Sequence, residues 1–234
     1  MRQATHIFRK ELNAYFISPI AYIVISVFLL VTGWFFFATF FLFNQANLRT
    51  FYALLPVVFA FVIPAITMRL ISEELNIGSD EILLTMPVTV RDVILGKFFA
   101  SVALIIAMMI PTLAYPLTVS LMGQLDWGPV VGGYLGAVFL GAAFCAVGLF
   151  ASALTRNQII AFIIGLVICF MLTLIDKMLY FLPRSLLGVF AYLGADFHFQ
   201  NIAKGIIDTR DILYFVSVCF VGLYGAYLAL QQKR

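Results

Sequence analysis

Six stretches of the chain are each long enough and apolar enough to cross a lipid bilayer as a helix. A hydrocarbon core about 30 Å thick needs roughly 20 apolar residues per helix. With 64% hydrophobic and only 11% charged residues, the chain cannot fold as a water-soluble globule. We therefore predict an all-α polytopic membrane protein, a single transmembrane domain over residues 1–234, with spans at residues 20–43, 51–70, 98–122, 129–154, 158–180 and 211–230.

The distribution of lysine and arginine predicts the orientation of these spans. Six spans place both termini on one side of the membrane, and nine lysines and arginines fall on that side against five on the other. Because positive residues favour the cytoplasmic side, we predict that both termini and residues 72–97 are cytoplasmic. The first stretch is too long for a signal-peptide core, so we expect it to be retained. The net charge of +3 includes no basic run that would indicate nucleic-acid binding.

Residues 2–17, before the first span, have the pattern of an amphipathic helix. Ile7 and Tyr15 fall on one face at helical spacing, and charged residues fall on the opposite face. We predict a helix that lies in the membrane interface, followed by an elbow at Ser18-Pro19. The helix would either anchor the chain or also contact a cytoplasmic partner.

The segment between the fifth and sixth spans, residues 181–210, is unusually apolar for a loop. Pro183 can start a short helix that ends at Gly194. We predict that this helix and a second one form an outer re-entrant or interfacial hairpin, which could close the outer end of a pathway. The second helix would run through Phe199, Ile202, Ile206 and Ile207.

Small residues and prolines mark several of the spans. The spacings Gly132-xxx-Gly136 and Ala137-xxx-Gly141 allow close approach of helix backbones, so we expect helix packing at Gly132, Gly136 and Gly141. Proline removes a backbone donor and can kink a helix, which either serves ordinary packing or gates a transporter. The prolines inside spans are Pro56, Pro64, Pro111 and Pro116.

The side chains needed for catalysis or for binding a metal do not form a recognisable pattern. His6 and His198 fall on opposite sides of the membrane, which argues against a metal site or a histidine-based catalyst. The pair Gly96-Lys97 lacks the remaining residues of a P-loop, so we expect no ATP site of that kind. The three cysteines all fall inside spans and are expected to be small packing residues.

Asp176 and Lys177 come close to the outer end of the fifth span. We consider two interpretations, an interfacial pair that marks the end of the helix and a role in an outer gate. The interiors of the spans are otherwise almost free of ionisable residues, which ion-coupled carriers generally need. Active transport by this chain would therefore require energy from another subunit.

A charged segment at residues 72–87 interrupts the apolar sequence between the second and third spans. It holds four of the chain's eleven carboxylates. We predict a short cytoplasmic helix around residues 78–85 that ends at Pro87 and docks a soluble partner, with Glu74, Asp80 and Glu81 outward. A second helix, capped by Thr89 and running over residues 90–97, would lead into the third span. The alternative is an acidic loop that only solvates the edge of the membrane.

The charged segment also carries a family motif. The pattern Glu74-xxx-Gly78-Ser79-x-Glu81-x-Leu83-Leu84-xx-Pro87, followed by Gly96-Lys97, resembles the signature of ABC-2 type transporter permeases. Ser79 replaces the usual threonine and keeps a hydroxyl. Further similarities over the whole chain are closest to the gliding-motility-associated permease branch, with the nitrous-oxide-reductase maturation permease as a relative. They include residues 18–22, 134–136, 152–158 and 198–208.

The resemblance implies a type V exporter-like permease fold in the bacterial cytoplasmic (inner) membrane. Such a permease dimerises, with itself or with a related permease, and recruits two separately encoded ATPase subunits that bind ATP and Mg. The chain itself would be non-catalytic and bind no cofactor, and an auxiliary extracytoplasmic protein is a further candidate partner. The resemblance also implies that the segment after the second span is the coupling helix, with contacts at Glu73, Glu74, Gly78, Ser79, Asp80, Glu81, Leu83, Leu84 and Pro87.

The family resemblance and the lack of catalytic residues rank three classes of function. The leading hypothesis is an ABC exporter permease that moves a lipid-like or amphipathic substrate, with spans one, two and five lining the pathway. The alternative is a mechanotransmitting membrane subunit that drives an extracytoplasmic partner and moves no substrate. A membrane-embedded enzyme is disfavoured because the residues for a catalytic site are missing.

Overall fold

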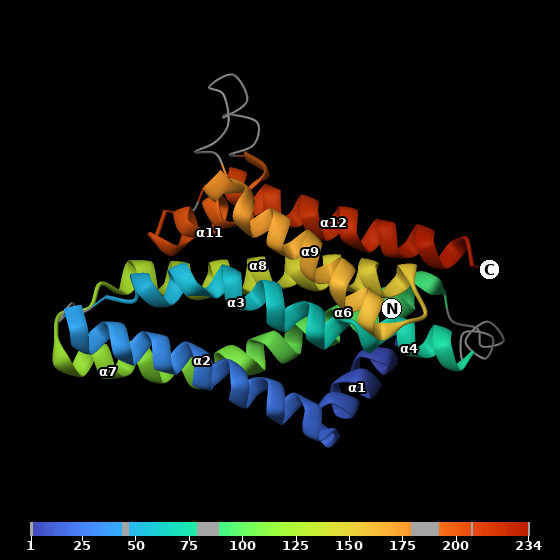
Figure 1. The fold of residues 1–234 in the computed structure, drawn as a ribbon, viewed down its shortest axis with the longest axis horizontal. Helices are drawn as coiled ribbons and strands as arrows, with labels where there is room; N and C mark the ends of the chain where they lie inside the picture. The colour runs from blue at the N-terminus through green and yellow to red at the C-terminus, as the bar shows by residue number, and fades with distance from the viewer. Residues whose placement is uncertain (1, 44–46, 79–88, 179–191, 207, 234) are drawn as a thin grey trace.

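The computed structural model describes residues 2–43, 47–78, 89–178, 192–206 and 208–233. All regular secondary structure in these residues is helical, which confirms the all-α prediction (Figure 1). The helices are α1 (Arg2–Ile17), α2 (Pro19–Phe43), α3 (Arg49–Thr67), α4 (Arg69–Ile77), α6 (Val90–Met109), the 3-10 helix η1 (Pro111–Leu113), α7 (Ala114–Met122), α8 (Trp127–Leu154), α9 (Gln158–Met178), α11 (Ala195–Ala203) and α12 (Thr209–Gln231).

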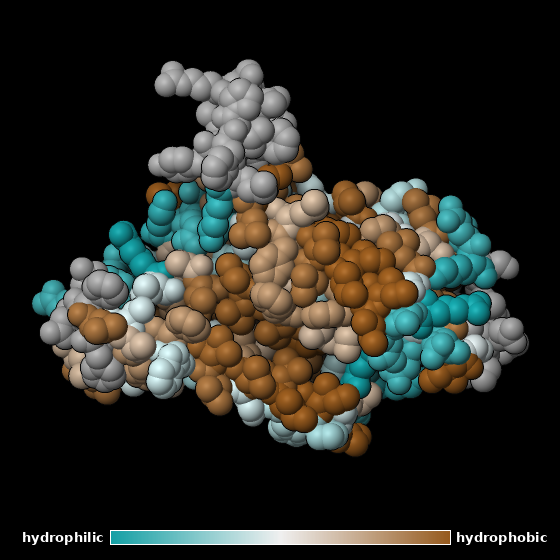
Figure 2. Space-filling view, in the orientation of Figure 1, coloured by the Kyte–Doolittle hydropathy of each residue, from teal (hydrophilic) through white to brown (hydrophobic). Residues whose placement is uncertain are grey.

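Six helical segments within the described residues are long and apolar enough to cross a membrane, as predicted. Figure 2 shows apolar side chains as a band across the middle of one face, with hydrophilic side chains gathered toward both ends. This distribution is what a protein with its ends in water and its middle in hydrocarbon requires. The segments are Pro19–Phe40, Arg49–Ile77, Val90–Met122, Trp127–Leu154, Gln158–Lys177 and Thr209–Gln231.

The second and third segments are longer than predicted. We placed the end of the second span at residue 70, but α4 continues from α3 after a single turn residue, Met68, and stays helical to Ile77. Thr89 caps α6 as expected, since its side chain accepts a hydrogen bond from the Asp92 N–H. The separate helix predicted over residues 90–97 is wrong, because α6 runs from Val90 without a break into the membrane.

The third segment is interrupted at Pro111 rather than kinked smoothly. Proline cannot donate the helical hydrogen bond, and its ring clashes with the preceding turn. The chain therefore passes through η1 before α7 begins at Ala114. By contrast, Pro56 and Pro64 both lie inside α3, which remains helical through them.

Helix α8 forms the centre of the molecule and contacts α3, α4, α6, α9, α11 and α12. Its apolar window is 72% buried, whereas those of α2, α9 and α12 are each 22% buried. Glycines on α8 allow the close contacts, since a Cβ on Gly133 would overlap the Tyr52 ring. A Cβ on Gly148 would likewise overlap the Thr67 hydroxyl. The helices that expose most apolar surface are thus the outer ones.

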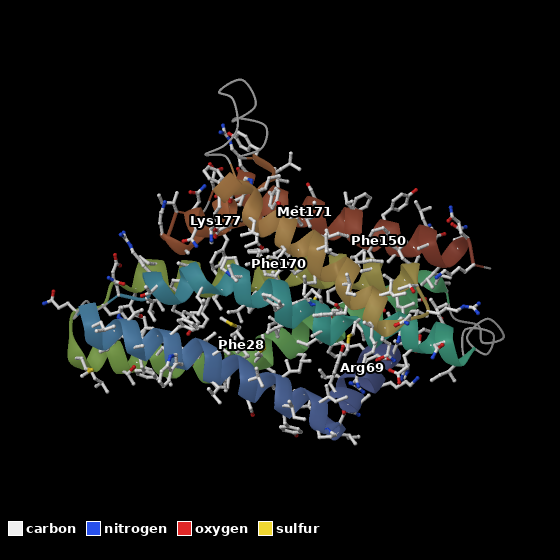
Figure 3. The ribbon with its side chains drawn as sticks, in the orientation of Figure 1. Phe28, Arg69, Phe150, Phe170, Met171 and Lys177 are labelled. Carbon is white, nitrogen blue, oxygen red and sulfur yellow. The ribbon has the colours of Figure 1, made fainter. Side chains whose placement is uncertain are left out.

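The two ends of the bundle carry different short helices. Helices α1 and α4 lie at one end together with the C-terminus, and α7 reaches the other end, where the chain turns into α8 (Figure 1). Figure 3 places Arg69 beside α1 and Lys177 beside α11. The sites described below lie at these ends.

Candidate coupling site

Helices α1, α4 and α6 meet at the buried ammonium group of Lys97. Its side chain is only 3% exposed. The Lys97 Nζ lies 3.0 Å from Glu11 Oε1 of α1 and 2.8 Å from Glu74 Oε1 of α4. Burial of an unpaired ammonium is very costly, so these two carboxylates hold the three helices together.

The glycine that precedes this lysine explains how α1 can cover it. A Cβ on Gly96 would lie 2.8 Å from the Ile7 Cβ and 3.0 Å from the Ala4 carbonyl oxygen. Only glycine lets α1 pack this closely against α6. The backbone of α1 is thereby brought near enough for Glu11 to reach Lys97.

A second contact joins α1 to the turn between α3 and α4. The guanidinium of Arg69 lies 5.6 Å from the centre of the Tyr15 ring, within the range of a cation–π interaction. The Tyr15 hydroxyl donates to the Ile66 carbonyl at 3.5 Å. Burial raises the pKa of Tyr15 well above its usual range, so the hydroxyl remains a protonated donor at neutral pH.

Ser152 of α8 satisfies the backbone groups that the turn at Met68 leaves free. Its hydroxyl donates to the Met68 carbonyl at 2.7 Å and accepts from the N–H groups of Ile71 and Ser72, each at 3.0 Å. Helix starts and ends expose such groups, which must find partners when buried. One serine therefore ties the α3–α4 junction to the centre of the molecule.

Helix α4 ends at Gly78, which adopts the left-handed conformation with φ of 73° and donates to the Glu74 carbonyl. Glycine at this position is a common helix C-terminal signal. Apart from Gly78, the short helix predicted around residues 78–85 lies outside the described residues, and it stays a prediction. The predicted coupling residues Ser79, Asp80, Glu81, Leu83, Leu84 and Pro87 lie outside the described residues.

The structure corrects the orientation that we predicted for Glu74. We expected its carboxylate to face outward toward a partner, but it points to Lys97, and its side chain is 25% exposed. Glu73, on the same helix, lines a cavity of about 450 Å³ between α1 and α4 that Arg69 also borders. Glu74 and Lys97 line the same cavity, so both carboxylates of α4 lie at this junction, and each side chain is partly buried.

At the opposite end, Asp176 and Lys177 bind α11 rather than each other. Asp176 Oδ2 accepts from the Phe197 N–H at 2.6 Å, which satisfies a free donor at the start of α11. The Lys177 Nζ lies 3.9 Å from Asp196 Oδ2. A Cβ on Gly194 would overlap the Asp176 carboxylate. Both residues therefore connect the end of α9 to α11, and the predicted gate role stays a proposal.

The same end holds a buried histidine–carboxylate contact that the sequence analysis missed. His198 Nδ1 lies 2.6 Å from Asp211 Oδ1, with side chains 2% and 3% exposed. The His198 ring stacks on Tyr214 with centroids 4.2 Å apart, and its Nε2 lies 3.1 Å from the Tyr192 carbonyl oxygen. From the sequence, we weigh His198 as a metal ligand or catalyst and as part of the family resemblance, and we assign no structural partner to it. The signal available was Asp211, a carboxylate at the start of an apolar span, which needs a partner.

The second short outer helix differs from the prediction in length. Helix α11 includes Phe199 and Ile202 but ends at Ala203, so Ile206 lies beyond it. Ile207 and the first predicted outer helix, from Pro183, lie outside the described residues. The structure places Gly132 against the Ile202 carbonyl, and Gly136 against Phe199 and Ile202, while Gly141 faces Ile105.

Among the described residues, no group of three or more histidine, cysteine, aspartate or glutamate side chains is arranged to hold a metal ion. The sequence analysis did not assign roles to Glu11, Lys97 or Ser152. Lys97 appears there only in the Gly96-Lys97 pair. A lysine seven residues into a helix that starts at Val90 was the available sign, because a cation so close to the membrane needs partners.

The comparison with protein families agrees with this architecture. The model of the ABC-2 family transporter protein family matches residues 30–217, from within α2 to within α12. A comparison with curated proteins gave no match. The match covers most of the chain, including α4, Lys97 and α11. The chain is therefore a multi-pass membrane protein that belongs to the ABC-2 transporter family.

Proposed function

We propose that this chain is the permease subunit of an ABC exporter in the bacterial cytoplasmic membrane, with both termini in the cytoplasm. Two copies of a separate ATPase subunit would bind ATP and Mg and drive it. The observation that carries the proposal is the three-helix junction at Lys97. It joins the segment that the family uses for coupling, through α4, to α1 and to the third span.

The junction provides a mechanical route from a soluble motor to the membrane. An ATPase that binds residues 79–87 would move α4 through Gly78. Because Glu74 and Glu11 share the Lys97 ammonium, α1 and α6 would move with α4. Ser152 holds the α3–α4 junction on α8, so it would act as the pivot. Buried cores transmit such displacements because they are densely packed.

The family resemblance of residues 73–87 supports a set of docking contacts. We propose Glu73, Gly78, Ser79, Asp80, Glu81, Leu83, Leu84 and Pro87 as residues that meet the ATPase. Glu74 instead positions α4, since it is engaged by Lys97. The distinction matters for any test, because reversing the charge of Glu74 would place two ammonium groups together inside the protein.

The docking test is charge reversal at Glu73 and Glu81, with co-purification of an ATPase encoded beside this chain as the measurement. We expect the double variant, Glu73→Lys with Glu81→Lys, to lose the ATPase and the stimulation of its turnover while its melting temperature stays unchanged. Lys204→Glu, an exposed charge reversal at the other end, is the matched control. If the double variant still binds the ATPase and supports normal turnover, the docking proposal is wrong.

Dimerisation and an apolar pathway are supported by the outer helices α2 and α9. Leu30 and Trp34 of α2 are 70% and 72% exposed, and Met171 of α9 is 67% exposed. Such faces meet either lipid or a second copy of the chain. We propose that two copies pair with α2 and α9 toward the pathway, which would favour a lipid-like or amphipathic substrate.

The mechanotransmitting alternative is separated from export by reconstitution of the permease with its ATPase. Export requires that ATP-dependent loss of a labelled amphipathic lipid from one leaflet accompanies turnover. Turnover that moves no such lipid, but depends on an extracytoplasmic partner, would favour mechanical work. The motifs at residues 18–22 and 152–158 support placement in the gliding-motility-associated branch, which the neighbouring genes would test.

A further inference from the structure

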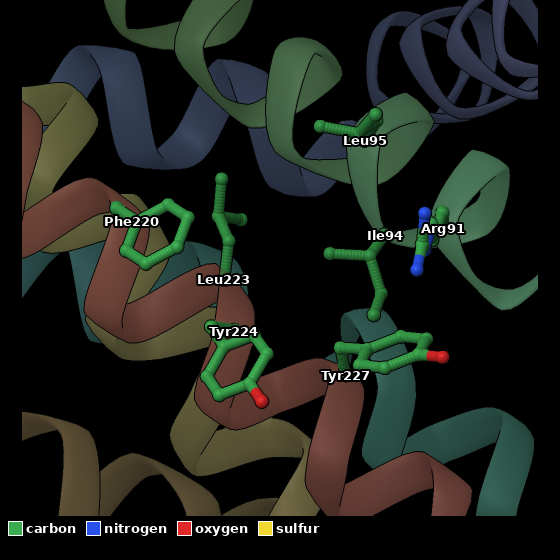
Figure 4. Close-up of a pocket in the computed structure, with 7 residues that line it drawn as sticks. All are labelled: Arg91, Ile94, Leu95, Phe220, Leu223, Tyr224 and Tyr227. Atoms are coloured by element: carbon green, nitrogen blue, oxygen red, sulfur yellow. The ribbon is translucent and has the colours of Figure 1, made fainter.

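Helices α6 and α12 form an open groove of about 390 Å³ at the end of the bundle that holds α4. One wall consists of Ile94 and Leu95 of α6, and the other of Phe220, Leu223 and the nearby tyrosines of α12. Figure 4 shows Arg91 beside Tyr227 at one end of the pocket and Phe220 at the opposite end. The groove is part of neither the junction at Lys97 nor the cluster around His198.

The groove runs along α12 over much of the thickness of one leaflet. Its lining on α12 runs from Phe220 to Tyr227, seven residues or about 10 Å at 1.5 Å per residue. Half of a hydrocarbon core about 30 Å thick is about 15 Å. The groove is therefore long enough to take much of one acyl chain lengthwise, and its Tyr227 end lies four residues, about 6 Å, from the end of α12.

The polarity of the groove changes along this depth. Phe220 and Leu223 line its deep end, and Tyr224 follows one turn later. The cation Arg91, the second residue of α6, lies at the shallow end with Tyr227. A ligand that matches this order has an alkyl chain and an anionic group at the membrane surface. A glycerophospholipid has that form.

Arg91 is placed to bind a phosphate. Its guanidinium carbon lies 5.4 Å from the centre of the Tyr227 ring, so the ring supports one face of the guanidinium. The N–H groups at the edges of a stacked guanidinium stay free to donate, and they match phosphate oxygens in pairs. No described carboxylate forms an ion pair with Arg91.

We propose that this groove binds an anionic glycerophospholipid, with one acyl chain between α6 and α12 and the phosphate on Arg91. The side chains that would contact the chain face outward, since Phe220 is 67%, Tyr224 52% and Leu95 39% exposed. Arg91 and Lys97 both lie on α6. The lipid would therefore bind the outward side of α6, whereas Glu11 and Glu74 bind Lys97 on its inward side.

The proposal is tested with the purified full-length chain by native mass spectrometry. The probe is phosphatidylglycerol with palmitoyl and oleoyl chains, compared with phosphatidylcholine of the same chains. We expect the wild-type chain to retain phosphatidylglycerol preferentially, and Arg91→Gln to weaken its binding about tenfold or more, because a charge-assisted contact is lost. Arg156→Gln, an exposed arginine outside the groove, should bind as the wild type does.

A second variant tests the groove itself. Leu95→Trp places bulk in the groove from a partly exposed position, so it should reduce the binding of both lipids while Arg91 is unchanged. Equal retention of the two lipids by the wild type, or unchanged binding by Arg91→Gln, would overturn the proposal. Displacement by excess inorganic phosphate would show a simple anion site. A disulfide between copies that carry Phe220→Cys would show that a second chain covers the groove.

Discussion

Lys97 is the residue of the junction that contacts both of the other helices through its side chain. It is a buried cation with carboxylates from two helices on it, at 3.0 and 2.8 Å. Each carboxylate is also partly shielded, with side chains 15% and 25% exposed for Glu11 and Glu74. Removal of the lysine would leave two negative groups side by side with no cation between them.

We predict that Lys97→Met lowers the free energy of unfolding by about 3–5 kcal/mol, the usual range when one partner of a buried ion pair is removed. Thermal unfolding in detergent measures the change. Lys204→Met, which removes an exposed lysine, is the control.

The combination of Lys97→Met with Glu11→Gln and Glu74→Gln should recover most of the lost stability, since no charge is then left unpaired. A single Lys97→Met variant that melts as the wild type does would show that the junction contributes nothing to the fold.

Ser152 gives a second prediction at the residue scale. Ser152→Ala removes the acceptor of the Ile71 and Ser72 N–H groups, and should cost about 1–3 kcal/mol because buried donors lose their partner. Ser217→Ala is the matched control, since that hydroxyl is exposed and donates only to the Leu213 carbonyl of its own helix. Equal melting temperatures of the two variants would contradict the role assigned to Ser152.

At the scale of elements, α11 is a short helix held in place by its neighbours. Asp176 of α9 satisfies its first turn, and His198 binds Asp211 of α12. A nine-residue helix is marginal on its own. Its position therefore depends on the ends of the fifth and sixth spans and on the start of α8, where Gly132 and Gly136 meet it.

We predict that Asp176→Ala loosens α11, because the Phe197 N–H loses its acceptor, an effect of about 0.5–2 kcal/mol for helix caps. Hydrogen exchange of residues 195–203 should become faster, with little change in α8. Thr89→Ala removes a cap at the other end of the bundle, where the Thr89 side chain accepts from the Asp92 N–H of α6, and should leave α11 unaffected. Unchanged exchange in α11 would count against this role of Asp176.

The elements differ in how far the sequence could predict them. The bilayer imposes a length on each span separately, so hydropathy alone located six. Hydropathy failed for α4, because Glu74 has the pattern of a loop residue as long as its partner Lys97 is unknown. Glu11 and Lys97 are 86 residues apart, and nothing local in either segment signals the contact. His198 and Asp211 were missed because each was considered without the other.

For the whole molecule, α8 is the helix against which most others pack. Glycines set the distance to its neighbours, with Gly133 at Tyr52, Gly148 at Thr67 and Gly222 of α12 at Ala146. Dispersion and close packing hold membrane helices together where water does not. A small increase in side-chain volume on α8 should therefore affect several spans at once.

We predict that Gly148→Ala destabilises the bundle by about 1–3 kcal/mol, as expected for overpacking, because the new methyl group overlaps the Thr67 hydroxyl. Gly128→Ala is the control, since its Cβ would meet the Asp126 carboxylate at 3.4 Å, an ordinary contact. Melting temperature and retention of monodisperse protein in detergent are the measurements. Full tolerance of Gly148→Ala would mean that α3 and α8 can separate freely.

The close packing of α1 on Gly96 also determines the order of assembly during synthesis. Glu11 leaves the ribosome 86 residues before Lys97. Until the third span has been made, neither the surface that receives α1 nor the cation that binds Glu11 exists. Helix α1 must therefore wait at the membrane surface and dock later, so a nascent chain that stalls before α6 carries an α1 that proteases can still reach.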